Sequence, residues 1–175
     1  MENNERKPRF SLMSISIIIM VLLVVAVGAI IALVSGFNGK ELKYGSVKAK
    51  ILPEENFTIE VEDGEVAIIS FNSEASTVAI PDKFDGDKLR SIEEEAFMEN
   101  NSISKVLIPD GVEKIGDKAF YYCMNLQYVY IPESVTEIGL NSFMGNGDNF
   151  TVYGKKNSYA EEFCEMHSIQ FKVDK

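Results

Sequence analysis

The sequence predicts a β-rich α/β solenoid of about four repeated units with parallel strands, preceded by one transmembrane helix. Two observations predict this architecture. The stretch KVLIPDGVEKIGDKAF, residues 105–120, returns as YVYIPESVTEIGLNSF, residues 128–143, after 23 positions. Residues 12–34 read LMSISIIIMVLLVVAVGAIIALV, without a charged residue or a proline. The expected segments are a cytoplasmic N-terminus (1–11), the span (12–34), a basic stalk (35–56) and the repeat domain (57–175).

The apolar segment 12–34 is long enough to cross a membrane. At about 1.5 Å per residue, its 23 residues span roughly 34 Å as a helix, against a hydrocarbon core of about 30 Å. The run exceeds the apolar region of about 7–15 residues that is typical of a cleaved signal peptide. We therefore interpret it as an uncleaved signal anchor, with cleavage as the alternative. Arg6, Lys7 and Arg9 favour a cytoplasmic N-terminus and an extracytoplasmic C-terminal domain.

Charge changes sharply after the predicted span. Residues 35–52 hold four lysines and one glutamate, whereas residues 53–175 hold 10 basic and 24 acidic residues, a net charge of −14. An acidic domain repels phosphate backbones, so nucleic acid is not an expected partner. The basic segment has two interpretations, a solvated polar stalk or a segment that lies against anionic lipid headgroups.

Columns of residues at 23-residue intervals predict the buried core. A single unit cannot bury its own apolar face, so successive units are expected to stack as turns of one coil. In KVLIP and YVYIP the strand period places valine and isoleucine on one face, and proline ends each strand. The expected core residues are Ile92, Phe97, Val106, Ile108, Ile115, Phe120, Val129, Ile131, Ile138, Phe143 and Val152.

Local signals predict how each coil turns and how the first coil is capped. The segment DKAF is expected to form a single helical turn, with Asp117 as its N-cap. FTIEVEDGEVAII, residues 57–69, contains two alternating runs around Asp63-Gly64, which predicts a β-hairpin. This hairpin would cover the N-terminal edge of the stack, because open repeat stacks need caps to stay soluble.

A helix is expected to close the C-terminal edge. Ser158 followed by Glu161 forms a capping box. The predicted helix runs from about Tyr159 to Met166, and a strand follows from Ile169.

The recurring pattern IP-x-x-V-x-x-IG-x-x-AF-x-x-C-x-x-L-x-x-V resembles the BspA-like leucine-rich repeat family of bacterial cell-surface proteins. The similarity covers residues 57–173, and the ending TVYGKKNSYAEEFCEMHSIQF is similar to the terminal repeat of that family. The resemblance implies a leucine-rich repeat solenoid. It implies no catalytic residues, and it does not specify a ligand, because members of the family differ in what they bind.

Candidate chemical groups in the sequence have simpler structural explanations. Cys164 and His167 lie three residues apart, but a histidine at a helix C-terminus is a favourable dipole partner and the cysteine occupies a packing position. Cys123 is expected to be a small buried apolar residue. The aspartates of DKFDGDK, residues 82–88, do not match an EF-hand loop and are expected in a solvated insertion. We therefore expect no enzymatic activity, no cofactor and no metal.

The outward face of the repeated strands is the predicted binding face. If Val106 and Val129 point inward, their neighbours point outward. Exposed tyrosines on a rigid sheet suit the binding of a protein or a sugar, whereas the alternative is cross-strand pairing that only stiffens the sheet. The predicted binding face consists of Lys105, Leu107, Tyr128, Tyr130, Thr151 and Tyr153.

Two functional hypotheses follow. The first is a membrane-anchored binding module for an unidentified protein or glycan at the cell surface. The alternative is a structural or accessory envelope protein whose span recruits a membrane partner and whose repeat domain is a spacer. Gly28 and Ala32 form a small-xxx-small pair, which favours weak dimerisation of the span.

Overall fold

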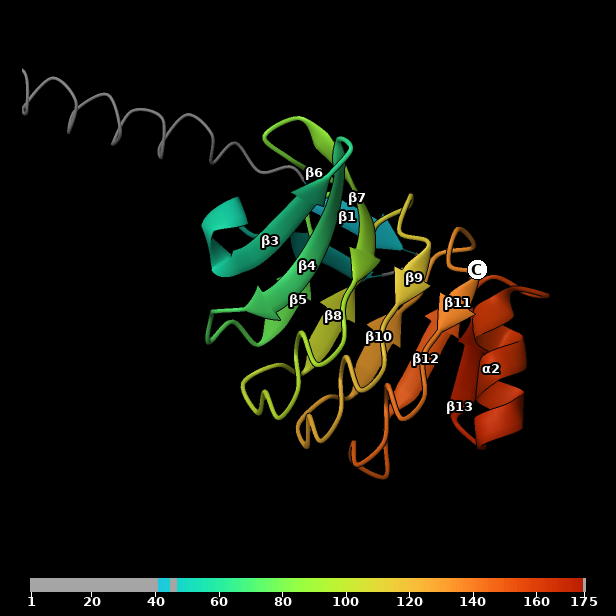
Figure 1. Ribbon diagram of the computed structural model, residues 1–175. Coiled ribbons are helices and arrows are strands. Elements are labelled where there is room, and N and C mark those ends of the chain that lie inside the picture. Colours follow the sequence, from blue (N-terminus) through green and yellow to red (C-terminus); the bar gives the residue numbers. More distant parts are fainter. Residues whose placement is uncertain (1–40, 45–46, 175) are drawn as a thin grey trace, which may run out of the picture. The chain divides into compact units, whose positions relative to one another are not determined.

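The computed structural model describes residues 41–44 and 47–174, and Figure 1 shows the arrangement of the coils. The segment from Lys40 to Lys175 is one compact unit. The strands are β1 (Glu41–Tyr44), β2 (Val47–Lys50), β3 (Phe57–Glu62), β4 (Glu65–Phe71), β5 (Thr77–Ala79), β6 (Lys83–Phe84), β7 (Asp87–Ile92), β8 (Lys105–Leu107), β9 (Lys114–Ile115), β10 (Tyr128–Tyr130), β11 (Glu137–Ile138), β12 (Thr151–Gly154) and β13 (Gln170–Val173). The helices are the short 3-10 helix η1 (Glu54–Asn56) and the α-helix α2 (Tyr159–His167).

The predicted span at 12–34, the N-terminus before it and the pair Gly28 and Ala32 lie outside the described residues. Among the helices of the described part, none combines the length and the apolar character that a membrane crossing requires.

Two sheets form the walls of the solenoid. In the first sheet, β5, β8, β10, β12 and β13 lie side by side and are all parallel. The register pairs Val106 with Val129 and Val129 with Val152, which is the 23-residue repeat of the sequence. The solenoid therefore has about five coils, one more than the predicted four. In the second sheet, β4, β7, β9 and β11 are parallel, β3 pairs antiparallel with β4 at one edge, and β6 pairs with β7.

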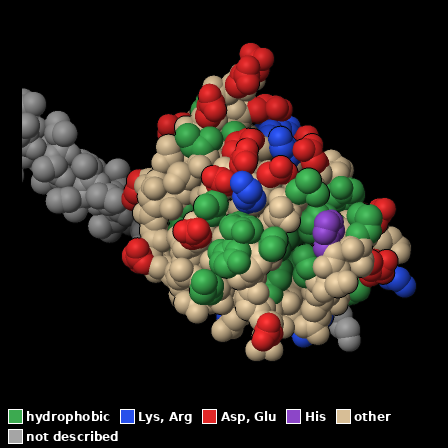
Figure 2. Space-filling view, turned by 60° about the horizontal axis from the view of Figure 1, so that its bottom comes forward, with side chains coloured by type: hydrophobic (Ala, Val, Ile, Leu, Met, Phe, Trp, Pro, Cys, Tyr) green, Lys and Arg blue, Asp and Glu red, His purple; other side chains and the backbone are tan. Residues whose placement is uncertain are grey.

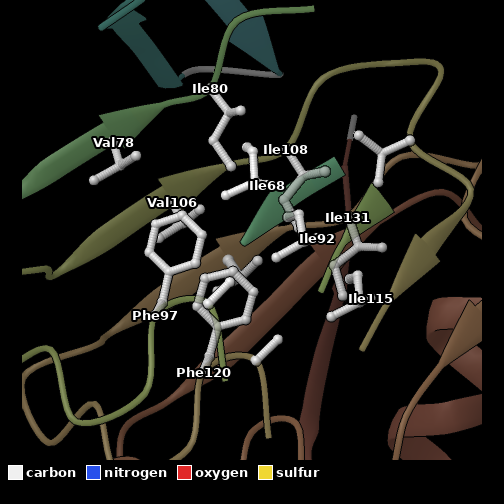
Figure 3. Packing of buried hydrophobic residues seen from close by; sticks show 14 of the residues in the cluster. Ile68, Val78, Ile80, Ile92, Phe97, Val106, Ile108, Ile115, Phe120 and Ile131 are labelled. Atoms are coloured by element: carbon white, nitrogen blue, oxygen red, sulfur yellow. The ribbon is translucent and has the colours of Figure 1, made fainter. Parts of the chain in front are cut away.

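The core lies between the two sheets and the turns that connect them. Figure 3 shows the isoleucines that follow β5, β8 and β10 pointing toward the isoleucines of the second sheet, with Phe97 and Phe120 nearby; the labelled residues are Ile80, Ile108 and Ile131 on one side and Ile68, Ile92 and Ile115 on the other. Each predicted core residue is buried, and none of them is more than 7% exposed. The phenylalanine rings form a stack, with centroids 4.8 Å apart between Phe97 and Phe120 and 5.5 Å apart between Phe120 and Phe143. Burial of such a continuous apolar column is the main driving force for stacking the coils.

Backbone hydrogen bonds between the turns explain the small residue before each phenylalanine. The Phe97 N–H donates to the Ala119 carbonyl and the Phe120 N–H donates to the Ser142 carbonyl, both at 2.8 Å. A larger side chain at the accepting residue would crowd the adjacent coil. The prediction that Asp117 caps its own turn is wrong, because its Oδ1 accepts a hydrogen bond from the Leu140 N–H of the next coil at 2.9 Å.

Both predicted caps are present. Strands β3 and β4 form the expected hairpin, and Asp63 and Gly64 have the positive φ angles, 52° and 77°, that a tight hairpin turn requires. At the other end, α2 begins after Ser158, whose Oγ accepts a hydrogen bond from the Glu161 N–H at 3.3 Å. The helix ends at His167, one residue later than predicted.

The predicted solvated stalk is wrong for residues 41–44 and 47–56, which are folded. Strands β1 and β2 pair as an antiparallel hairpin, and η1 follows them before β3. Apolar and charged residues alternate along both strands, so that one face of the hairpin packs on the repeat domain. The predicted domain boundary at residue 57 therefore falls inside a compact unit. The insertion at 82–88 is also more ordered than expected, because β6 pairs with β7 and Phe84 lies in the core, 2% exposed.

The phenylalanine stack predicts the effect of a truncation. Phe120→Ala removes a fully buried ring between two others and should lower the free energy of unfolding by about 3–5 kcal/mol. Urea denaturation of the unit Lys40–Lys175 measures the change. The control Glu137→Gln alters an exposed side chain and should change stability by less than about 0.5 kcal/mol. A loss below about 1 kcal/mol for Phe120→Ala would contradict the buried stack.

Candidate functional site

The outer face of the five-stranded sheet is covered by the β1–β2 hairpin. The ring of Tyr44 stacks on that of Tyr130, with centroids 3.4 Å apart and an angle of 12° between the planes. After β2, Ile51 bridges β5 and the Leu52 N–H donates to the Ala79 carbonyl at 2.9 Å. The apolar contact between hairpin and sheet involves Leu42, Tyr44, Ala49, Ile51, Ala79, Leu107, Tyr128, Tyr130 and Tyr153.

This contact contradicts the expected exposure of the predicted binding face. Leu107, Tyr128, Tyr130 and Thr151 are buried, Tyr153 is half-buried, and only Lys105 is exposed. The side chains do point away from the solenoid core, as their strand phase predicts. They are buried by the hairpin and by one another.

The remaining contacts on this face are also internal. The rings of Tyr128 and Tyr153 meet edge to face at 5.0 Å, and the Lys172 ammonium lies 5.8 Å from the centre of the Tyr153 ring. The Thr151 hydroxyl donates a hydrogen bond to Gln170 Oε1 at 2.7 Å. This part of the sheet is therefore a packed contact and not an open recognition surface.

Burial controls the ionisation of the covered tyrosines. Burial raises the pKa of Tyr128 and of Tyr130 to about 12, and the carboxylate of Asp174 adds to both shifts. Burial and the nearby carboxylate of Asp110 raise the pKa of Tyr44 as well. The Tyr128 hydroxyl is buried without a hydrogen-bond partner in the described part of the protein. These phenols remain neutral at physiological pH, as a packed apolar contact requires.

A different surface displays exposed apolar side chains. Figure 2 shows them gathered on the face formed by the turns between the two sheets, which is the lower end of the molecule in Figure 1. Leu140 is 66% exposed, Met166 62% and Met124 58%. We call this surface the turn face, and its members are Met98, Tyr121, Tyr122, Met124, Leu140, Met144 and Met166.

The repeat register positions the turn face. Each core phenylalanine points inward, so the residue after it points outward, which places Met98, Tyr121 and Met144 in one column. Backbone hydrogen bonds join these turns. For example, the Tyr122 N–H donates to the Met144 carbonyl at 2.8 Å. Gly145 has a φ of +79°, and a Cβ there would lie 2.5 Å from Cδ2 of Tyr122. Glycine at this position therefore lets the tyrosine ring lie across the next turn.

Acidic side chains border the turn face. In Figure 2 they follow one margin of the apolar area. Glu94 and Glu95 are exposed on the turn before Met98, and the Lys118 ammonium lies 2.8 Å from Glu95. The hydrogen bond from Lys118 to Glu95 raises the pKa of that lysine. The rim remains acidic, consistent with the net charge of −14 for residues 53–175.

A polar groove continues from the turn face toward the first sheet. It has a volume of about 420 Å³. Its lining includes Ser102, Ser104, Met124, Asn125, Gln127, Asp148 and Asn149. Met124 belongs to both the groove and the turn face, so the apolar and polar surfaces are continuous.

The thiols and the histidine do not form a reactive pair. Cys123 and Cys164 are both buried free thiols, and burial raises the pKa of each to about 12. Neither is a nucleophile at neutral pH, because the reactive form is the thiolate. His167 is exposed, and its ring stacks on Phe163 at 4.3 Å. In the described ranges, no three His, Cys, Asp or Glu side chains are placed to hold a metal ion together.

Sequence reasoning missed the turn face, although a signal for it was present. Residues 98, 121 and 144 form a column at the 23-residue interval, directly after the phenylalanine column. Methionine, tyrosine and methionine in an outward column are unusual for a solvated turn, where polar residues are the rule. The column therefore predicts an exposed apolar stripe once the phenylalanines are assigned to the core.

The comparisons with known proteins agree with this architecture. The BspA type leucine-rich repeat region family matches residues 70–172, with six copies of the repeat. No curated protein matches the sequence. A leucine-rich cell surface protein from Faecalibacterium prausnitzii is similar in structure, with 23% identity and a TM-score of 0.52, over 62% of this chain and 31% of that one. A leucine-rich repeat protein from Bacteroides ovatus shares 22% identity with a TM-score of 0.46, over 70% of this chain and 40% of that one.

The buried tyrosines predict a loss of stability at high pH. The folded pKa of Tyr128 and Tyr130 lies near 12, above the value of about 10 in an unfolded protein. The stability that these neutral phenols contribute is therefore complete below pH of about 10 and is lost as the pH rises toward 12. Thermal unfolding, combined with ultraviolet titration of phenolate, measures this loss. The double variant Tyr128→Phe/Tyr130→Phe should lose less stability over the same interval, and an equal loss would contradict the prediction.

Proposed function

The chain belongs to the BspA-type leucine-rich repeat family, and we propose that it is a membrane-anchored interaction module whose turn face binds a protein outside the cytoplasm. The observation that carries the proposal is the group of exposed apolar side chains on the turns, Met98, Met124, Leu140 and Met144, with the half-buried Tyr121 between Met98 and Met144 in the repeat register. Contiguous apolar surface on a folded domain commonly marks an interaction site.

The side chains of the turn face suit a protein partner. Methionine adapts its shape to irregular apolar surfaces, and tyrosine supplies a large contact area at a small entropic cost. The acidic rim selects against acidic partners and favours one that surrounds an apolar patch with lysine or arginine. We therefore infer a partner protein with an apolar and basic surface. The adjacent polar groove offers amide and hydroxyl groups for hydrogen bonds at the edge of the contact.

The position of the β1–β2 hairpin supports this choice of surface. A ligand on the outer face of the five-stranded sheet would first have to displace the stack of Tyr44 on Tyr130. The turn face requires no such displacement, because its side chains are exposed in the folded domain except for the half-buried Tyr121.

The sequence supports the anchoring part of the proposal. Residues 12–34 have the length and composition of a membrane span, and Arg6, Lys7 and Arg9 favour a cytoplasmic N-terminus. In this orientation the repeat domain is outside. The Faecalibacterium protein of similar fold is itself a cell surface protein.

This topology predicts a protease result. Protease added to intact cells or protoplasts should degrade the part of the protein that follows the span, because residues 35–175 lie outside. Immunoblotting with a C-terminal tag measures the loss, and a cytoplasmic protein serves as the control for cell integrity. A protected domain with cleavage near Arg6 would contradict the orientation.

Substitutions on the turn face test the binding surface. Met98→Ser, Leu140→Ser and Met144→Ser together should reduce proximity labelling of the specific partner by about tenfold or more, about 1.4 kcal/mol. These side chains are exposed, so the fold should remain stable. The measurement is proximity labelling from the C-terminus of the full-length protein in cells, followed by titration of the purified partner against the purified variants.

A matched control distinguishes specific binding by the turn face from non-specific association of exposed apolar side chains. Val61→Ser, Ile69→Ser and Val173→Ser also remove three exposed apolar side chains, from strands β3, β4 and β13. This control should leave labelling and affinity unchanged. An unchanged affinity in the turn-face variant would refute the assignment, and so would an equal loss in both variants.

A further inference from the structure

We infer that the outer face of the β1–β2 hairpin docks on the anionic lipid headgroups of the membrane in which the protein is anchored. This inference rests on the proposed anchoring through residues 12–34 and extends it, because it assigns an orientation to the repeat domain. We call the docking surface the lysine face, and it consists of Lys43, Lys48 and Lys50.

The pairing of the hairpin gathers these lysines on one side. Leu42, Tyr44 and Ala49 face the sheet of the solenoid, whereas the lysines between them are exposed. Lys43 and Lys48 are directly opposite each other across the two strands. Like charges at opposed positions destabilise a strand pair in water. Glu41, on the same face, is opposite Lys50, so the four side chains together carry a net charge of +2. A negatively charged surface would offset the repulsion between Lys43 and Lys48 and attract this net positive charge.

The lysine face is held firmly to the repeat domain. The stack of Tyr44 on Tyr130 and the hydrogen bond from the Leu52 N–H to the Ala79 carbonyl fix the hairpin at two positions. An interaction of the lysines with a membrane would therefore orient the solenoid and not merely a loose segment.

The sequence leaves little distance between the span and this surface. The predicted span ends at Val34 and β1 begins at Glu41, so six residues connect them. Even fully extended, six residues reach only about 20 Å. The hairpin is thus the part of the domain that this connection holds nearest to the headgroups, where attraction of lysine by anionic lipid acts over a short range.

The charge of the rest of the domain favours the same orientation. Residues 53–175 carry a net charge of −14 and are repelled by an anionic surface. Tyr44 of the hairpin stacks on Tyr130, the last residue of β10, and the Leu52 N–H donates to Ala79, the last residue of β5, whereas the turn face precedes the first residues of the strands. Figure 1 shows the hairpin and the turns toward opposite ends of these strands. Docking by the lysine face therefore leaves the turn face uncovered, at the side of the domain.

Lysine acetylation of the full-length protein in nanodiscs tests the inference. One set of discs contains neutral phosphatidylcholine, and the other contains about 30% anionic phosphatidylglycerol. Mass spectrometry reports the rate at each lysine after brief exposure to a water-soluble acetylating reagent. Lys43, Lys48 and Lys50 should react about threefold or more slowly in the anionic discs, and about 0.5 M salt should abolish the difference. Lys88 and Lys114 of the second sheet and the exposed Lys156 serve as references and should react equally in both.

Two matched variants extend the test. Lys43→Gln/Lys48→Gln/Lys50→Gln removes the lysine face, and Lys88→Gln/Lys114→Gln/Lys156→Gln removes the same charge elsewhere on the domain. Amide hydrogen exchange of β1 and β2 is the measurement. Anionic discs should slow this exchange in the original protein and in the second variant, but not in the first.

The outcomes separate this inference from the proposed function. Equal acetylation in both kinds of disc, with the protein present in them, would overturn the lipid contact and leave the anchoring intact. An equal decrease in the acetylation rate of every lysine would also overturn the inference, because that result indicates general electrostatic attraction without a defined docking face. Failure of the protein to enter discs would overturn the anchoring and this inference together.

Discussion

The alignment of each coil with the next determines which residues of this domain are buried and which are exposed. Parallel strands lie about 4.8 Å apart, so residues separated by 23 positions become neighbours in adjacent coils. The same register that stacks Phe97 on Phe120 also places Met98 beside Tyr121. An apolar inner column therefore stabilises the solenoid, and the next column, Met98, Tyr121 and Met144, is directed outward. This column of the turn face is a direct consequence of the repeat.

The inner columns were predictable from sequence because two independent signals agree there. The 23-residue interval identified equivalent positions, and the strand period identified which of them face inward, as for Val106 and Ile108. The outward-facing strand positions lack a second signal that would show whether they are exposed. The strand phase correctly directed Leu107 and Tyr130 away from the core, but a residue that leaves the core is exposed only if no other segment covers it.

The β1–β2 hairpin, which covers the sheet, shows that a local sequence pattern does not specify long-range contacts. Apolar and charged residues alternate in ELKY and VKAK, which is a strand signal, but the lysines favoured interpretation as a solvated stalk. Even a correct prediction of the hairpin would not have shown where the hairpin packs on the domain. Its position depends on the contact of Tyr44 with Tyr130, residues far apart in the sequence, and no local pattern specifies that contact. The binding face predicted on these tyrosines is therefore a structural contact, and the turn face takes its place as the candidate site.

Under the proposed anchoring, folding of the hairpin onto the domain also affects how the turn face is presented. A flexible stalk over residues 35–56 would let the turn face lie at a wide range of distances from the membrane. Residues 41–44 and 47–56 belong to the domain, so only the six residues 35–40 lie between it and the predicted span, about 20 Å when fully extended. Restricting the positions of the domain before binding lowers the entropy that association would otherwise cost. In this proposal the tyrosine contact acts indirectly, because it holds the hairpin on the domain and so shortens the connection to the span.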